Sequence, residues 1–160
     1  MCSLMNLYPL KKTKILVVSK NNYIRGPLVE KVLEKNLPKD KFLIISAGDE
    51  ILNNKSIDPK TEQFLIYQGY PINSIFKPKK LTAMMLKSND YILILDDDIF
   101  DDLKKRFKDI FKKIKLFNSP EPNSSIRLNH NMSNDNIQFI MKNLLFFSLI
   151  WADYFKLGKS

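Results

Sequence analysis

The sequence predicts an α/β fold in three layers: a four-stranded, parallel, doubly wound sheet with helices on both faces. Two observations support this prediction. Short apolar runs alternate along the chain with longer segments in which apolar residues recur at helical spacing. The short runs are apolar throughout, as strands buried on both faces of a parallel sheet are. At 160 residues, 44% of them hydrophobic, the chain is long enough for one domain with a sizeable core.

The first strand is predicted at 14–18 and leads through a seven-residue loop into a helix at 27–37. Pro27 takes the first helical position, where a missing N–H and a fixed φ are tolerated best. Behind it, apolar residues recur at helical spacing, and Pro38 ends the helix.

The second strand is predicted at 42–46, and Ser46 to Gly48 then turn the chain. Asp58 caps the next helix, which begins at Pro59 and runs to Gly69. An acidic residue before a helix and a glycine after it are the usual signals of its two ends.

The second half of the chain continues the alternation. Tyr91 to Leu95 is its clearest strand and ends in the acidic run Asp96 to Asp98. Asp135 is expected to cap the final helix. The predicted elements are a short helix from Leu81 to Leu86, the strand at 91–95, a helix with Ile99, Leu103, Phe107 and Ile110 as its apolar positions, a strand at 114–117, a Pro- and Asn-rich loop at 118–134 and a helix at 135–155.

The domain is expected to cover 13–157, after a loose extension at 1–12. Cys2 is the sole cysteine, so the sequence predicts neither a disulfide framework nor a cysteine metal site. The N-terminus lacks a long apolar core followed by a cleavage site. We therefore expect no signal peptide and a cytoplasmic location.

The formal net charge is +9, from 26 basic and 17 acidic residues. A basic surface attracts nucleic acid or anionic lipid. However, all but three of the basic residues are lysines and asparagine is also abundant, which an AT-rich coding sequence produces without selection for binding. Charge alone is therefore weak support for a nucleic-acid partner.

The loop after the first strand is a candidate anion-binding site. A loop that feeds a helix N-terminus presents unpaired backbone N–H groups and the positive end of the helix dipole. Arg25, in a chain that otherwise uses lysine, suggests a planar bidentate contact. Its alternative role is to brace the loop against the loop's own carbonyls or a carboxylate. The predicted anion-binding residues are Lys20, Asn21, Asn22, Tyr23, Ile24, Arg25 and Gly26.

Five residues separate Ser19 from Arg25, and Pro27 follows after one more. With this spacing between the first strand and the first helix, the chain resembles the low-molecular-weight protein tyrosine phosphatases. Their signature is Cys, five residues and Arg, followed by Ser or Thr and Pro. The resemblance places Asn22 at the asparagine of the family's loop.

Weaker similarities to the same family follow in the same order along the chain and extend the resemblance over about 14–155. Together they imply the family's fold. They are Ser46 to Gly48 after the second strand, Asp58-Pro59 and Gly69 at the ends of the second helix, Lys79 to Thr82, and Leu95-Asp96 at the end of the third strand.

The chemistry departs from the family's pattern. In the family the loop cysteine is a thiolate nucleophile, its pKa lowered by the amide cradle and the arginine. Ser19 stands at that position, where a hydroxyl stays protonated. Gly26 replaces the Ser or Thr that assists the leaving thiolate, and the place of the general-acid Asp falls on Leu128. The resemblance therefore implies a catalytically inactive pseudophosphatase that binds a phosphate-bearing ligand, a phosphoprotein or another partner protein.

Two other functions stay open. The first is an active protein tyrosine phosphatase in which Ser19 has replaced a natural cysteine. The second is a structural subunit of a larger assembly, which could contain nucleic acid. His130, the only histidine, is either a partner for Ser19 in attack or a solvated loop residue. Tyr23 either replaces the family's specificity aromatic or blocks the pocket.

The acidic residues after the third strand form a possible metal site at Asp96 to Asp98 with Asp101 and Asp102. They lack a defined ligand spacing, however, and acidic residues in the first turn of a helix complement its dipole. We predict no metal and no cofactor.

The last helix is apolar nearly all round from Ile137 to Phe155. A helix that packs on a sheet needs only one apolar face. The surplus predicts a protein–protein contact through this helix. Lys142-Asn143 and Asp153 interrupt the apolar run, so we expect no membrane span.

Overall fold

The computed structural model describes residues 11–51, 57–70, 72, 76–117 and 134–158. β1 (Thr13–Ser19), β2 (Phe42–Gly48), β3 (Tyr91–Ile94) and β4 (Ile114–Leu116) form a four-stranded parallel sheet in the order β2-β1-β3-β4. The helices are α1 (Arg25–Asn36), α2 (Pro59–Tyr67), α3 (Ala83–Ser88), α4 (Asp97–Arg106) and α5 (Asn134–Lys156). The predicted doubly wound α/β fold is confirmed.

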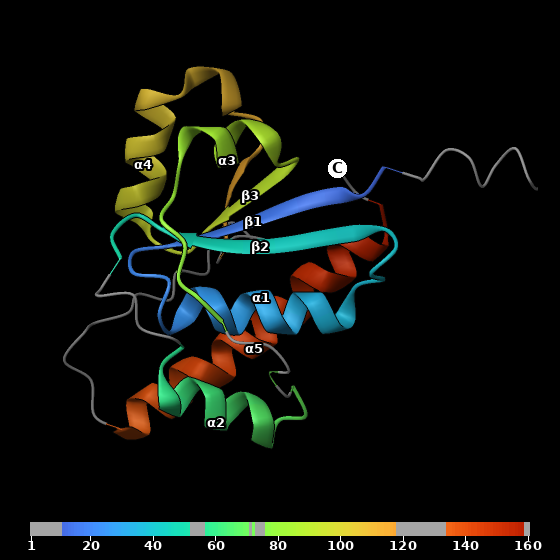
Figure 1. Cartoon of the computed structure of the whole chain (residues 1–160), viewed down its shortest axis with the longest axis vertical. Coiled ribbons are helices and arrows are strands. Elements are labelled where there is room, and N and C mark those ends of the chain that lie inside the picture. The colour runs from blue at the N-terminus through green and yellow to red at the C-terminus, as the bar shows by residue number, and fades with distance from the viewer. Residues whose placement is uncertain (1–10, 52–56, 71, 73–75, 118–133, 159–160) are drawn as a thin grey trace, which may run out of the picture.

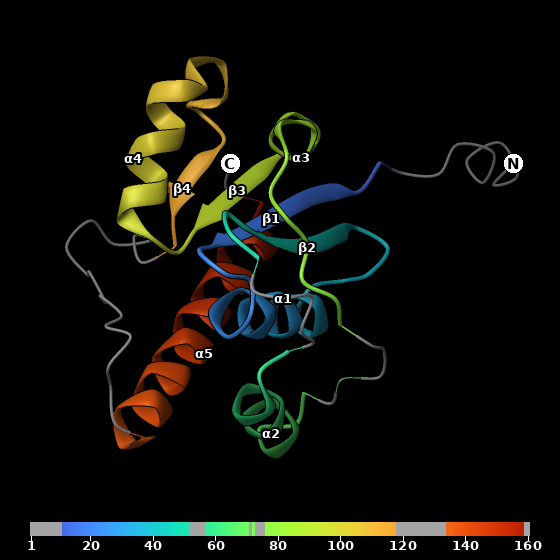
Figure 2. The same cartoon turned by 60° about the vertical axis from the view of Figure 1, so that its left-hand side comes forward.

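The helices cover both faces of the sheet (Figures 1 and 2). α1 and α5 lie on one face, with α2 beyond them, whereas α3 and α4 lie on the other. The side chains of β1 alternate between the two cores: Ile15 and Val17 face α1 and α5, whereas Leu16 and Val18 face α3 and α4. All four are fully buried, which explains why this strand is apolar on both faces.

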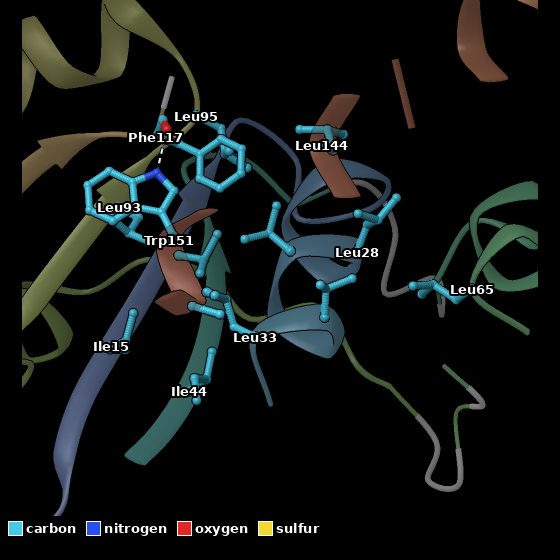
Figure 3. Packing of buried hydrophobic residues seen from close by; sticks show 14 of the residues in the cluster. Ile15, Leu28, Leu33, Ile44, Leu65, Leu93, Leu95, Phe117, Leu144 and Trp151 are labelled. Atoms are coloured by element: carbon cyan, nitrogen blue, oxygen red, sulfur yellow. Dashed lines mark hydrogen bonds between the residues drawn. The ribbon is translucent and has the colours of Figure 1, made fainter. Parts of the chain in front are cut away.

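The larger core lies between the sheet and the α1–α5 layer. Trp151 of α5 is 2% exposed, and its indole N–H donates a hydrogen bond to the carbonyl of Phe117, directly after β4 (Figure 3). Phe117 itself is fully buried. The bond satisfies a polar group on each partner inside the core and joins α5 to the end of β4.

Several helix ends differ from the prediction: α2 ends at Tyr67 and α3 spans Ala83–Ser88. α1 begins at Arg25, so Pro27 is its third residue rather than its first. Proline is still tolerated there, because the first four N–H groups of a helix have no acceptor within it. α4 ends at Arg106, and a separate 3-10 helix, η2 (Lys108–Ile110), follows as the chain turns back toward β4. α5 begins one residue before Asp135, so this residue lies inside the helix rather than at its cap.

Part of the apolar surface of α5 is exposed. Phe139 is 67% exposed, Phe146 58% and Leu149 36%. The helix therefore has more apolar surface than its packing on the sheet and α1 uses. The protein–protein contact through this helix stays a prediction. Over the described ranges, no helix is both long enough and apolar enough to cross a bilayer.

Candidate anion-binding site

The loop between β1 and α1 lies at the carboxyl edge of the sheet. From β1 the chain moves outward to β2 and then crosses back to β3 on the other side of β1. The crevice between the ends of β1 and β3 is therefore the switch point of the sheet, where ligands of open α/β sheets bind. The residues at this crevice come from the loop, the first turn of α1 and the segment after β3.

The peptide groups of the loop are oriented by hydrogen bonds to neighbouring segments. The carbonyls of Ser19, Lys20 and Tyr23 accept from the N–H groups of Asp49, Glu50 and Asp58, at 3.0, 2.7 and 3.1 Å. In a trans peptide, the carbonyl and the following N–H point in opposite directions. The N–H groups of Lys20, Asn21 and Ile24 therefore point away from these segments.

Ser19 lies at the base of the loop and is only 2% exposed. Its Oγ accepts a hydrogen bond from the N–H of Asn22, at 3.1 Å. A Cβ on Gly26 would lie 2.9 Å from this Oγ and 2.7 Å from Asn22 Oδ1, closer than real Cβ contacts come. The loop side chains thus occupy the space around residue 26 that a larger residue would need.

Asn22 adopts a positive φ of 51° and is fully buried. Asparagine tolerates this left-handed conformation better than most residues. Its Nδ2 donates to the carbonyl of Ser46 at 3.4 Å, whereas its Oδ1 has no hydrogen-bond partner within the described ranges. A buried acceptor without a donor is costly. A Cβ on Gly26 would lie 2.7 Å from this acceptor, so Asn22 Oδ1 faces residue 26, where a glycine stands instead of the Ser or Thr that the resemblance implies.

Arg25 forms a bidentate ion pair with Asp96, the second residue after β3. Nη1 lies 2.8 Å from Oδ1 and Nη2 2.9 Å from Oδ2, and the two side chains are 11% and 20% exposed. Of the two roles expected for Arg25, the bracing of the loop by a carboxylate is present. The bidentate contact uses two of the five N–H donors of the guanidinium and leaves the others for another acceptor.

A buried carboxylate supports the loop from behind. Glu30 of α1 is 7% exposed, and its Oε1 accepts from Ser46 Oγ at 3.0 Å. Ser46 in turn accepts from Asn22 through its carbonyl, so the three residues form a chain from α1 through β2 to the loop. Burial raises the pKa of Glu30, against the opposing effects of Lys31, whose Nζ lies 3.5 Å from Oε2, and of the Ser46 hydrogen bond.

Replacing Glu30 by Gln is expected to remove one pH-dependent contribution to stability. Because its pKa in the folded protein is raised above 4.5, the folded state holds this proton to higher pH than the unfolded chain does. The contribution of Glu30 to the free energy of unfolding therefore falls as the pH rises from about 4.5 through the raised pKa. Urea unfolding from acidic to neutral pH measures it.

The stability of wild type minus that of Glu30→Gln should fall across this range. The control is Glu34→Gln, on the same helix, whose side chain is 44% exposed. A difference between wild type and Glu30→Gln that stays constant with pH would contradict the raised pKa.

The structure describes some of the other predicted site residues, and the rest lie outside the described ranges. Tyr23 is half-buried in the loop. Asp102 pairs with Arg106 at 2.8 Å, and Asp97 and Asp98 lie in the first turn of α4, as expected for residues that complement its dipole. Within the described ranges, no three His, Cys, Asp or Glu side chains gather as a metal site. Cys2, Arg127, Leu128 and His130 lie outside the described residues.

Sequence reasoning missed Glu30 and Ser46 as supports of the loop. Glu30 stands among the apolar positions of α1, between Val29 and Val32. A carboxylate on the buried stripe of a helix is rare without a partner. The position of Glu30 on this stripe therefore indicated that a polar partner lies nearby. Its partner on β2 could not be identified before the sheet was known.

Comparisons with known proteins identify the family of this chain. Residues 14–131 match the family model of the low molecular weight phosphotyrosine protein phosphatases. A relative from Sus scrofa, a low molecular weight phosphotyrosine protein phosphatase, is 28% identical over 120 residues, which cover 70% of this chain and 75% of the relative. EpsP of Ralstonia nicotianae, a probable low molecular weight protein-tyrosine-phosphatase, is 30% identical over 82 residues. That match spans 51% of this chain and 54% of the relative, which is about half of each.

Solved structures share the fold. The tyrosine phosphatase Wzb of Escherichia coli K30, in complex with sulphate, has a TM-score of 0.77 at 21% identity, over 91% of this chain and 99% of that one. A low molecular weight phosphotyrosine phosphatase of Vibrio cholerae has a TM-score of 0.79 at 19% identity, over 92% and 99%. The resemblance seen in the sequence is confirmed: the chain belongs to the low molecular weight phosphotyrosine protein phosphatase family.

Proposed function

We propose that this chain is a catalytically inactive member of its family that binds a phosphate group without hydrolysing it. The main support is Ser19, a buried hydroxyl at the position of the nucleophilic thiolate. A serine hydroxyl is a weak nucleophile unless a base takes its proton. Within the described residues, the hydrogen bond at Ser19 Oγ comes from the Asn22 N–H, which is a donor and cannot act as that base.

Several features support binding of the phosphate group. The loop N–H groups that point away from the neighbouring segments, the N-terminus of α1 and the guanidinium of Arg25 all belong to the segment at the switch point of the sheet. Wzb of E. coli K30, which has this fold, has been solved with sulphate and with phosphate. The carboxylate of Asp96 competes for Arg25, so an anion has to share or displace it. A phosphate-bearing protein is the expected ligand.

Turnover of p-nitrophenyl phosphate tests the loss of catalysis. Wild type and Ser19→Cys are both expected to stay near the buffer rate, because a restored thiol still lacks the leaving-group hydroxyl at residue 26 and the general acid. Appreciable turnover by Ser19→Cys would favour an enzyme whose cysteine was replaced. Turnover by wild type would overturn the proposal.

Calorimetric titration with inorganic phosphate tests the binding. Wild type should bind, and Arg25→Ala should not. Arg106→Ala is the matched control, since Arg106 also pairs with an aspartate but is 52% exposed and belongs to α4. Equal loss in both arginine variants, or no binding by wild type, would contradict phosphate binding at the loop. The cytoplasmic location, the single domain at 13–157 and the contact through α5 stay predictions.

A further inference from the structure

The positive charge of the chain is concentrated in one segment far from the anion-binding loop. We call residues Lys104–Lys115 the α4–β4 tip. Seven of these twelve residues are basic and one, Asp109, is acidic, which gives a net charge of +6, against +9 for the whole chain. The first half of α4 is the opposite, with Asp97, Asp98, Asp101 and Asp102. α4 is thus acidic where it begins, near the carboxyl edge of the sheet, and basic where it ends.

The α4–β4 tip lies at one end of the longest axis of the molecule, and α2 with the first turns of α5 lies at the other (Figures 1 and 2). It consists of the last turn of α4, η2 and the start of β4. Ile110 and Ile114 are 3% and 6% exposed and hold it on the α3–α4 core. The tip is therefore a protruding turn with a fixed base rather than a loose tail.

The α4–β4 tip also carries an exposed aromatic side chain, Phe111. Phe111 is 56% exposed, and Lys105, Lys108 and Lys112 of the same tip are also exposed. The Nζ of Lys104 lies 4.9 Å from the ring centroids of both Phe111 and Phe100. An exposed aromatic ring in a lysine-rich turn matches the boundary between the headgroups and the acyl chains of a membrane, where lysines meet phosphates and the ring enters the apolar layer.

We propose that the α4–β4 tip binds the surface of a membrane rich in anionic phospholipid headgroups. Two features favour this partner over nucleic acid. Lysines act as compact point charges without the planar fork that reads nucleic acid, and the one arginine of the tip, Arg106, already pairs with Asp102. In addition, base stacking needs free aromatic faces, but cations lie over the rings of Phe100, Phe107 and Phe111. In this arrangement the protein contacts the surface of the bilayer through the tip.

The test is co-sedimentation of the full chain with two kinds of vesicles: phosphatidylcholine alone, and equal parts of phosphatidylcholine and phosphatidylserine. Wild type should bind only the phosphatidylserine vesicles and should be released by salt. Lys108→Glu/Lys112→Glu should lower the partition coefficient at least about 25-fold, since each lysine near an anionic surface contributes roughly fivefold. Phe111→Ala should lower it about tenfold, through loss of the buried ring.

The matched control is Lys39→Glu/Lys41→Glu, which makes the same change in net charge with two exposed lysines between α1 and β2. This variant should keep most of the binding, and thermal melting checks that all variants are folded. Equal losses in both double variants would overturn the proposal, because the attraction would then come from net charge alone. Tighter binding to single-stranded RNA than to the phosphatidylserine vesicles, or full binding by Phe111→Ala, would also overturn it.

Discussion

An Asp96→Asn protein is expected to lose about 2–3 kcal/mol of unfolding free energy in phosphate-free buffer and to regain much of it when phosphate is added. Asp96 accepts two hydrogen bonds from Arg25, at 2.8 and 2.9 Å. Removing its charge leaves the guanidinium unpaired in a site that is only 11% exposed. Unpaired buried charges cost more than this, and the partial exposure of both side chains reduces the loss.

The phosphate dependence distinguishes the two roles of Arg25. If the loop binds an anion, Asp96 competes with it, so the neutral variant should gain more stability from phosphate than wild type does. Urea unfolding with and without phosphate measures both quantities. Asp102→Asn is the control, because its pair with Arg106 is more than half exposed and should contribute less than about 0.5 kcal/mol. An Asp96→Asn protein that phosphate does not stabilise would show that Arg25 only braces the loop.

The strands and the loop were predictable because their signals are local. The run Ile15 to Val18 is apolar on both faces because both faces are covered, and the spacing of Ser19 and Arg25 is contained in one loop. The pairing of Arg25 with Asp96 is not local. These residues are 71 positions apart, and they meet only because β1 and β3 are neighbours in the sheet. In the sequence, Asp96 fitted equally well as an acidic residue beside a helix N-terminus.

The contacts of Ser46 and Glu30 behind the loop are also not local in the sequence. Ser46 donates to Glu30 and accepts from Asn22, so its role depends on the register between β1 and β2, in which Val17 is opposite Ser46. The hydrophobic pattern of the two strands does not specify which residue of β1 lies opposite the polar Ser46. The end of α4 is a related case, since Phe107 and Ile110 continue the helical spacing although the chain turns between them. Their burial could be predicted, but the break in the helix could not.

Gly48→Ala is expected to cost about 2–3 kcal/mol of stability and to weaken phosphate binding at least tenfold. A Cβ at Gly48 would lie 2.9 Å from the carbonyl carbon of Asn21 and from the N of Asn22. Gly48 itself is held on both sides, since its N–H donates to Lys79 and its carbonyl accepts from Leu81, each at 2.8 Å. The strain therefore falls on the loop backbone, whose N–H groups would turn away from the anion. Urea unfolding and phosphate titration measure the two effects.

Gly26→Ala is the matched comparison, because it adds the same methyl group on the other side of the loop. Its Cβ would meet Asn22 Oδ1 and Ser19 Oγ, which are the ends of side chains and move by rotation. Its effect on stability should therefore be the smaller, about 1 kcal/mol. If Gly48→Ala instead binds phosphate as wild type does, β2 does not fix the loop. The ranking of the two variants thus shows whether the conformation of the loop is maintained by backbone packing against β2 or by the side chains inside the loop.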